Sequence, residues 1–154
     1  MSGNKEHGGA AVPRYEVLRV KRLHPNAIIP KYTSPGAGGF DLHCLESVTI
    51  KPQTTVLVRT GLVMELPPGT EMQIRPCSEV VLKQLCCIPD SPSTVSADYQ
   101  GEIMVIMRNM SMWRPLSFRA GDRVARGVVV SEAVRCVVVE VERDTDRQDR
   151  QGGE

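Results

Sequence analysis

The stretch Pro92–Asn109, PSTVSADYQGEIMVIMRN, decides the fold of this chain of 154 residues. It begins with turn-forming residues, passes through Tyr99 and Gly101, and continues with alternating aliphatic side chains. Apolar residues at every second position, several of them β-branched, indicate a strand with one buried face. We therefore predict a hairpin whose second arm is a buried strand. Such a hairpin either presents backbone groups and one ring to a small flat ligand, or is a core hairpin in which the tyrosine fills a gap.

The same alternation recurs along the chain, with proline and glycine between the segments. Short strands that are interrupted about every 8 to 12 residues predict an all-β domain, either a sandwich, a barrel or a jelly roll. One helix is expected over residues 78–85, SEVVLKQL, with Ser78 available as its N-cap. The expected strands cover residues 15–23, 40–44, 47–52, 55–61, 62–69, 71–76, 102–109, 115–118, 123–131 and 134–142.

The composition is that of an ordinary globular chain. Its hydrophobic fraction is 41% and its formal net charge is +1 at pH 7, so no basic excess calls for nucleic acid or a membrane surface as a partner. No apolar run reaches the roughly 20 residues of a membrane span, and the first residues do not resemble a signal peptide. The 5 cysteines lack regular spacing, which favours buried, reduced thiols over a disulfide framework or a zinc site. We expect an intracellular protein, cytoplasmic or nuclear.

One domain is expected at this length. Residues 1–12 are polar and glycine-rich and are predicted to form a flexible tail, and residues 13–142 are predicted to form the β domain. Residues 143–154, RDTDRQDRQGGE, contain no apolar side chain. We expect them to form a solvated arm, or an arm that becomes ordered on a ligand or partner.

A glycine-rich stretch, residues 30–44, contains the first candidate functional group. Its sequence PKYTSPGAGGFDLHC places four small residues before Phe40, Asp41 and Leu42. Small residues allow the backbone to approach a neighbour closely, and Asp41 is expected on the opposite face from its two apolar neighbours. A carboxylate there could orient a magnesium-bound water or a sugar hydroxyl. The alternative is a turn whose glycines need positive φ and whose aspartate caps it.

Two later stretches contain hydroxyl and cationic groups. In QIRPCSEVVLK, residues 73–83, Arg75 ends a strand and Ser78 stands at a helix start, which suits a phosphate site as well as a simple N-cap. In AGDRVARGVVVS, residues 120–131, a tight turn leads into a strand that carries Arg126. Taken alone, this last stretch is typical of a hairpin with exposed cations.

In this order, the four stretches resemble the motifs of the trimeric dUTPase family. GGFDLHC at residues 38–44 resembles the end of the first motif, G-x-D-L, and residues 76–81 resemble the second, P-R-S-G-L-A. Residues 93–101 resemble the third, G-V-I-D-x-D-Y-R-G, and residues 121–127 resemble the fourth, G-D-R-I-A-Q-L. Four motif matches in the same order and at compatible spacing identify a family far more specifically than any one match alone.

The resemblance implies a β jelly-roll (β-clip) subunit, a homotrimer with active sites between subunits, and hydrolysis of dUTP to dUMP and diphosphate with magnesium. Uracil would pair with the hairpin backbone beside Tyr99, whose ring would lie against the deoxyribose and exclude a 2′-hydroxyl. Cytosine would leave buried polar groups unpaired. By resemblance, the nucleotide-binding residues are Arg75, Ser78, Tyr99, Gly101, Arg126 and Arg147, the catalytic positions are Asp41, Ser96 and Asp98, and Asp41 meets Mg²⁺ through water.

This chain departs from the family pattern at several of these positions. Ser96 stands where the family has the aspartate that activates water, and a hydroxyl is no base near pH 7. Cys77 and Glu79 replace an arginine and a glycine of the second motif, which removes a cation and adds an anion near the phosphates. Arg126 replaces a glutamine and could return positive charge. After Arg147 the aromatic lid of the fifth motif is absent, so closure over the ligand would be weak.

Three functions follow from this pattern. The first is a homotrimeric member of the family that keeps the pocket for dUTP or dUMP, with weak or lost hydrolysis. The second is an active dUTP diphosphatase that uses Asp98 or Asp90 as base and Arg126 as phosphate clamp. The third is a non-catalytic trimeric scaffold for protein partners. No membrane or nucleic-acid partner is expected in any of them.

Overall fold

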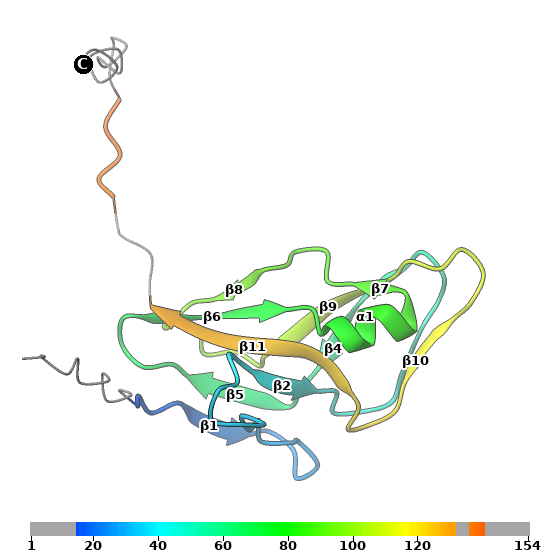
Figure 1. Cartoon of the computed structure of the whole chain (residues 1–154), viewed down its shortest axis with the longest axis horizontal. Coiled ribbons are helices and arrows are strands. Elements are labelled where there is room, and N and C mark those ends of the chain that lie inside the picture. The colour runs from blue at the N-terminus through cyan, green and yellow to red at the C-terminus, as the bar shows by residue number, and fades with distance from the viewer. Residues whose placement is uncertain (1–14, 132–135, 141–154) are drawn as a thin grey trace, which may run out of the picture.

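The computed structural model describes residues 15–131 and 136–140, and its elements are almost all strands (Figure 1). The predicted all-β class is confirmed. The boundaries predicted at residues 12 and 143 lie outside the described residues. In chain order the elements are β1 (Arg19–Arg22), β2 (Phe40–His43), β3 (Val48–Ile50), β4 (Thr55–Arg59), β5 (Leu62–Glu65), β6 (Thr70–Arg75), α1 (Ser78–Gln84), β7 (Cys86–Cys87), β8 (Ser93–Val95), β9 (Met104–Asn109), β10 (Leu116–Phe118) and β11 (Arg123–Ser131).

Two sheets share the hydrophobic core. The larger sheet has the order β2-β11-β6-β8 and the smaller one β4-β9-β7, and the pairs β1–β5 and β3–β10 complete the fold. All the strand pairs are antiparallel. Alternate side chains of both sheets point into one buried cluster, as period-two sequences require. Phe40, Leu42, Met72 and Ile74 of the larger sheet and Val105 and Met107 of the smaller one are at most 2% exposed.

The contact between β2 and β11 explains one glycine of the glycine-rich stretch. A Cβ on Gly39 would lie 2.6 Å from the carbonyl oxygen of Gly127 on β11. Gly39 therefore permits the close backbone approach that the sequence predicts. The alternative of positive φ is wrong for this stretch, because the described glycines with positive φ are Gly61, Gly69 and Gly121.

The predicted hairpin is wrong in its pairing. β9 is the buried strand that the alternation indicates, but it pairs with β4 and β7, whereas β8 pairs with β6. Residues 96–103 therefore cross from one sheet to the other instead of forming a tight hairpin turn. Alternation identifies a strand and its buried face, but it does not identify the partner strand.

The helix is where the sequence predicts it, but its cap is different. The N-cap residue is Cys77, with no side-chain hydrogen bond to the helix, so Ser78 is the first helical residue and is exposed. The short strand β7 was not predicted, and β8 corresponds to the first arm of the expected hairpin. Residues 136–140, expected to lie in a last strand, belong to no strand, and Val137, Val138 and Val139 are at least 70% exposed.

Within the described ranges, no helix is long and apolar enough to cross a membrane. The 5 cysteines form no disulfide, as expected. Cys44 and Cys86 are buried as predicted, Cys77 and Cys87 are half-buried, and Cys136 is exposed, so the prediction of burial holds only in part.

Candidate functional site

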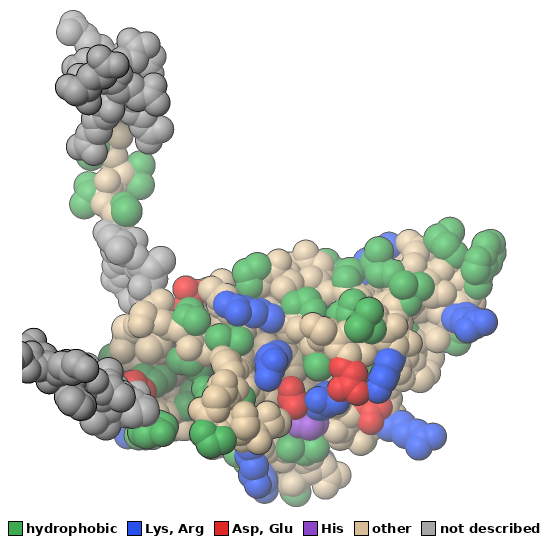
Figure 2. Space-filling model, in the orientation of Figure 1, with side chains coloured by type: hydrophobic (Ala, Val, Ile, Leu, Met, Phe, Trp, Pro, Cys, Tyr) green, Lys and Arg blue, Asp and Glu red, His purple; other side chains and the backbone are tan. Residues whose placement is uncertain are grey.

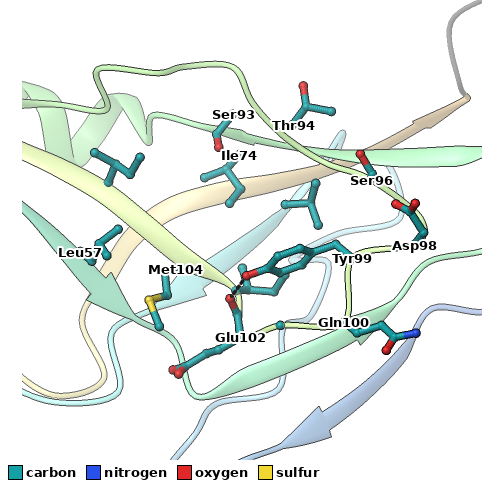
Figure 3. Close-up of a pocket in the computed structure, with 14 residues that line it drawn as sticks. Leu57, Ile74, Ser93, Thr94, Ser96, Asp98, Tyr99, Gln100, Glu102 and Met104 are labelled. Carbon is teal, nitrogen blue, oxygen red and sulfur yellow. Dashed lines mark hydrogen bonds between the residues drawn. The ribbon is translucent and has the colours of Figure 1, made fainter.

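A cavity of about 650 Å³ lies between the edge of the larger sheet at β8 and the outer face of β9. Its volume is within the usual range for sites that bind small molecules. Four residues that the sequence predicts for the site line it together: Ser96, Asp98, Tyr99 and Gly101 (Figure 3). The apolar wall opposite them is formed by Leu57, Ile74, Met104 and Ile106.

The Tyr99 ring lies across this cavity in a defined position (Figure 3). Its hydroxyl donates a hydrogen bond to the carbonyl oxygen of Glu102 at 3.0 Å. A Cβ on Gly101 would lie 2.5 Å from the Tyr99 hydroxyl oxygen and 2.7 Å from Cζ. The ring therefore lies directly against Gly101, and a glycine is required beneath it. Half of the Tyr99 surface stays exposed, so one face of the ring is available to a ligand.

Ser96 and Asp98 lie at one end of the cavity in this view (Figure 3). The Tyr99 N–H donates to the Ser96 carbonyl oxygen at 3.0 Å, which closes a turn that presents both side chains to solvent. Asp98 therefore stands in the cavity with a free carboxylate, since no described residue forms a hydrogen bond or ion pair with its side chain. Asp90, the other carboxylate considered from the sequence, does not line this cavity.

Glu102 also lines the cavity. The sequence motifs did not indicate it as a site residue. Its side chain is 10% exposed, and its carboxylate accepts hydrogen bonds from Arg59 Nε at 3.1 Å and from the Gly61 N–H at 2.8 Å. A buried carboxylate is stable when donors satisfy it in this way. Because the Glu102 carboxylate is bonded to Arg59 and Gly61, Asp98 is the carboxylate of the cavity lining that is open to a ligand. No local sequence signal reveals this pairing, because Arg59 lies 43 residues away.

A second group of predicted residues lies on the outer face of the larger sheet. Arg126 on β11 is opposite Asp41 on β2 and opposite Arg75 on β6, so the three side chains form a row across the sheet. Arg75 donates to Gln73 Oε1 at 2.7 Å, and no described carboxylate lies within ion-pair distance of Arg126. Like charges directly opposite one another in a sheet are unfavourable, and a bound anion would relieve them. This row can hold a phosphate.

Beside this row, Arg123 connects β11 to α1. Its Nη1 lies 3.5 Å from Asp41 Oδ2 and its Nη2 lies 2.6 Å from Glu79 Oε2, while Lys83 Nζ lies 2.6 Å from Glu79 Oε1. Hydrogen bonds from Lys83 and Arg123 lower the pKa of Glu79, and Glu79 raises the pKa of Arg123. Glu79 therefore stays ionised at neutral pH. The sequence singled out Glu79 for its charge but did not predict its partner.

A preformed metal cage is absent from the described residues, since no group of three His, Cys, Asp or Glu side chains lies close enough to hold an ion. Asp41 is 14% exposed and faces Arg123. Magnesium in nucleotide sites is commonly held by one or two carboxylates, waters and the phosphates themselves. A carboxylate such as Asp41 is compatible with a magnesium ion that would arrive with a phosphate chain.

The structure divides the predicted site residues into two groups. The residues that line the Tyr99 cavity do not include Asp41, Arg75, Ser78 or Arg126. These residues lie on the outer face of the larger sheet and at the start of α1. Arg147 lies outside the described residues. In this chain the two groups of predicted residues therefore do not share one cavity.

Comparisons with known proteins agree with the motifs. The dUTPase family model matches residues 25–154. The Deoxyuridine 5'-triphosphate nucleotidohydrolase of Wolinella succinogenes is 50% identical over 112 residues, 73% of this chain and 74% of that protein. The protein of the same name from Picosynechococcus is 47% identical over 131 residues, 84% of this chain and 92% of that one. A mutant dUTPase from phage phi11 of S. aureus has the same fold, with a TM-score of 0.76, 20% identity and coverage of 83% of this chain and 98% of that one.

Proposed function

The chain belongs to the dUTPase family, and we propose that it binds deoxyuridine nucleotides in the Tyr99 cavity and hydrolyses dUTP to dUMP and diphosphate slowly. One observation supports this combination above the others. The Tyr99 ring packs against Gly101 in the cavity wall, and Ser96, which carries a hydroxyl, stands at the position expected for the catalytic base.

Recognition of the nucleoside follows from the shape of the cavity. The backbone of residues 96–103 crosses between the sheets outside any strand, so it offers N–H and C=O groups to the edge of a base. The exposed face of the Tyr99 ring packs against the deoxyribose, and a 2′-hydroxyl would meet the ring. The phosphates extend toward the arginine row of a neighbouring copy, where Arg75 and Arg126 face them and Ser78 offers its hydroxyl.

Slow hydrolysis follows from the group beside the attacking water. Loss of a positioned general base costs about 10²- to 10⁴-fold in rate. The Ser96 hydroxyl orients a water by hydrogen bonding but does not take its proton near pH 7. A magnesium ion bound with the phosphate chain would supply positive charge for the phosphates, and Asp41 would be the residue that holds it through water.

A second candidate function is full dUTP diphosphatase activity with Asp98 as the base. The specific observation in its favour is that the Asp98 carboxylate is open and lies in the lining of the same cavity. The names of the relatives at 45 to 50% identity point the same way. Asp90 is the weaker choice, because it does not line the cavity.

A homotrimer is part of the proposal, because the family has its active sites between subunits and the cavity of this chain does not include the arginine row. Two exposed apolar surfaces support association. Leu57 beside the cavity is 62% exposed, and Val137, Val138 and Val139 are more exposed still. Burial of such side chains against another copy removes apolar area from water.

The test is a measurement of diphosphate release from dUTP with magnesium, for the parent and for two variants. Ser96→Asp restores a carboxylate and is expected to raise the rate by about 10²-fold or more. Asp98→Asn is expected to change the slow parent rate by less than about threefold if Asp98 is not the base, and to abolish a fast parent rate if it is. A parent that already turns over at about 10 per second or faster contradicts slow hydrolysis.

Binding separates a nucleotide pocket from a pure scaffold. Calorimetry with a non-hydrolysable dUTP analogue and with dUMP reports the pocket directly. Heat that disappears in Tyr99→Ala supports the proposal. Absence of heat at millimolar ligand, in a protein whose mass in solution is that of a trimer, supports the scaffold function.

A further inference from the structure

The corner where α1 meets β2 and β11 carries ion pairs at the place where the motifs predict phosphate binding. Arg123 Nη2 lies 2.6 Å from Glu79 Oε2, and Arg123 Nη1 lies 3.5 Å from Asp41 Oδ2. Both terminal nitrogens of this guanidinium therefore face carboxylate oxygens. Arginine binds phosphate through the same paired N–H groups, so this arginine is engaged before a phosphate arrives.

Glu79 also holds the second cation at this corner. Lys83 lies one turn further along α1, with Nζ 2.6 Å from Glu79 Oε1, so each oxygen of the carboxylate takes one cation. Glu79, Lys83 and Arg123 line one open cavity of about 240 Å³. Figure 2 shows acidic and basic side chains mixed on this face, below α1.

The nearby arginine row is different. Arg75 and Arg126 lie opposite each other, and neither has a carboxylate within ion-pair distance among the described residues, although Arg126 is opposite Asp41 in register. The row and the corner together therefore present two cations without a carboxylate partner and two that pair with Glu79. A ligand with one phosphate needs only the open pair. Glu79 directly follows Ser78, the predicted phosphate-contacting hydroxyl, on α1, so a phosphate chain long enough to extend from the open pair to Ser78 would approach Glu79.

We infer that Glu79 is a specificity-determining residue that competes with the phosphate chain for Arg123 and Lys83, so that the site prefers deoxyuridine monophosphate to the triphosphate. The inference rests on the proposed function and names the ligand within its substrate class. Each additional phosphate adds negative charge near the Glu79 and Asp41 carboxylates and finds fewer unoccupied donors. The preference for one phosphate is therefore expected to weaken when the charge of Glu79 is removed.

The test compares Glu79→Gln with a matched control, Glu65→Gln. Glutamine keeps the size of the side chain and removes its charge. Glu65 is an exposed carboxylate that forms a similar ion pair, with Arg19 at 3.3 Å, on β5 away from this corner. Calorimetry measures the affinities of each protein for dUMP, for a non-hydrolysable dUTP analogue and for inorganic tripolyphosphate. Thermal unfolding of each variant checks that the fold is intact.

We expect the parent to bind dUMP at least as tightly as the triphosphate analogue. In Glu79→Gln, affinity for the triphosphate analogue and for tripolyphosphate should rise about fivefold or more, the effect of one unit charge about 4 Å away in water, and affinity for dUMP should rise less. Glu65→Gln should change none of the three. Equal gains for all ligands, or no gain for the triphosphate, would overturn the inference.

A second variant is expected to change the triphosphate affinity in the opposite direction. Lys83→Met removes a cation and leaves Glu79 on Arg123, so triphosphate affinity should fall further while dUMP affinity changes little. If it does not fall, Lys83 is not one of the contested cations. The tripolyphosphate measurements need no uracil pocket. Failure of the proposed function, seen as no binding of any deoxyuridine ligand, is therefore distinguishable from failure of the role assigned to Glu79.

Discussion

The sharpest prediction concerns Gly101→Ala. Its φ is not positive, so alanine is allowed by the backbone, and the effect must come from contact. The new methyl group would lie 2.5 Å from the Tyr99 hydroxyl oxygen and 2.7 Å from Cζ, distances that require the ring to move. Moving it breaks the 3.0 Å hydrogen bond to the Glu102 carbonyl oxygen. A net hydrogen bond is worth about 1 kcal/mol, so unfolding free energy should fall by about that amount.

The effect on binding should be a separate loss of similar size. Aromatic packing of a ring against a ligand is worth about 1 kcal/mol, so dUMP affinity should fall by roughly five- to tenfold. Urea unfolding measures the first quantity and calorimetry with dUMP the second. Tyr99→Phe is the control for the hydrogen bond alone, because it keeps the ring and loses the hydroxyl.

A double-mutant cycle tests the cause. In a Tyr99→Ala background the added methyl group meets no ring, so Gly101→Ala should then cost almost nothing in unfolding free energy. An equal cost in both backgrounds would refute the argument, since the loss would then arise from the backbone and not from the contact between Gly101 and Tyr99.

Three further predictions concern the frame of the site. Asn109→Ala should cost about 3 kcal/mol in urea unfolding, because the Asn109 side chain is fully buried and bonds the Ile50 and Arg114 carbonyl oxygens and the Ser111 N–H; a cost below about 1 kcal/mol would contradict this account. Gly127→Ala should lower the free energy of unfolding by about 1 to 3 kcal/mol, because the new Cβ would lie 2.5 Å from the Phe40 ring. Gly36 has open space around it, so Gly36→Ala should be near neutral in the same assay. Burial raises the pKa of Cys86 to about 11, so at pH 8 its thiolate fraction is on the order of one in a thousand. Iodoacetamide should therefore label the exposed Cys136 well before Cys86, as followed by peptide mass spectrometry. Equal labelling of the two cysteines would contradict the burial of Cys86.

Several features of the fold could be predicted because they are local. The alternation through β9 predicts a buried strand, and the structure buries Val105 and Met107 on one face of it. The proline and glycine breaks place most strands within a few residues of their observed bounds. The helix after Pro76 follows from an eight-residue pattern, although its cap does not, because capping depends on a single backbone conformation at Cys77.

In the candidate site, too, local features could be predicted from the sequence and contacts between distant residues could not. Ser96, Asp98, Tyr99 and Gly101, which one motif contains, line one cavity, because all four lie within a few residues of one another. They do not indicate that Glu102 is tied to Arg59 or that Glu79 holds Arg123, since these pairs join residues more than 40 positions apart. Such pairs depend on which strands become neighbours.

The sequence by itself determined the all-β class, the order of the motifs and the chemical groups at each position, because the spacing of apolar and polar residues acts over a few residues at a time. Only the tertiary structure decided that β8 and β9 belong to different sheets, that Tyr99 lies on Gly101, and that Glu79 engages two cations. The physical reason is that pairing energies depend on distances in space, and the chain brings distant residues together only when the two sheets close over a shared core.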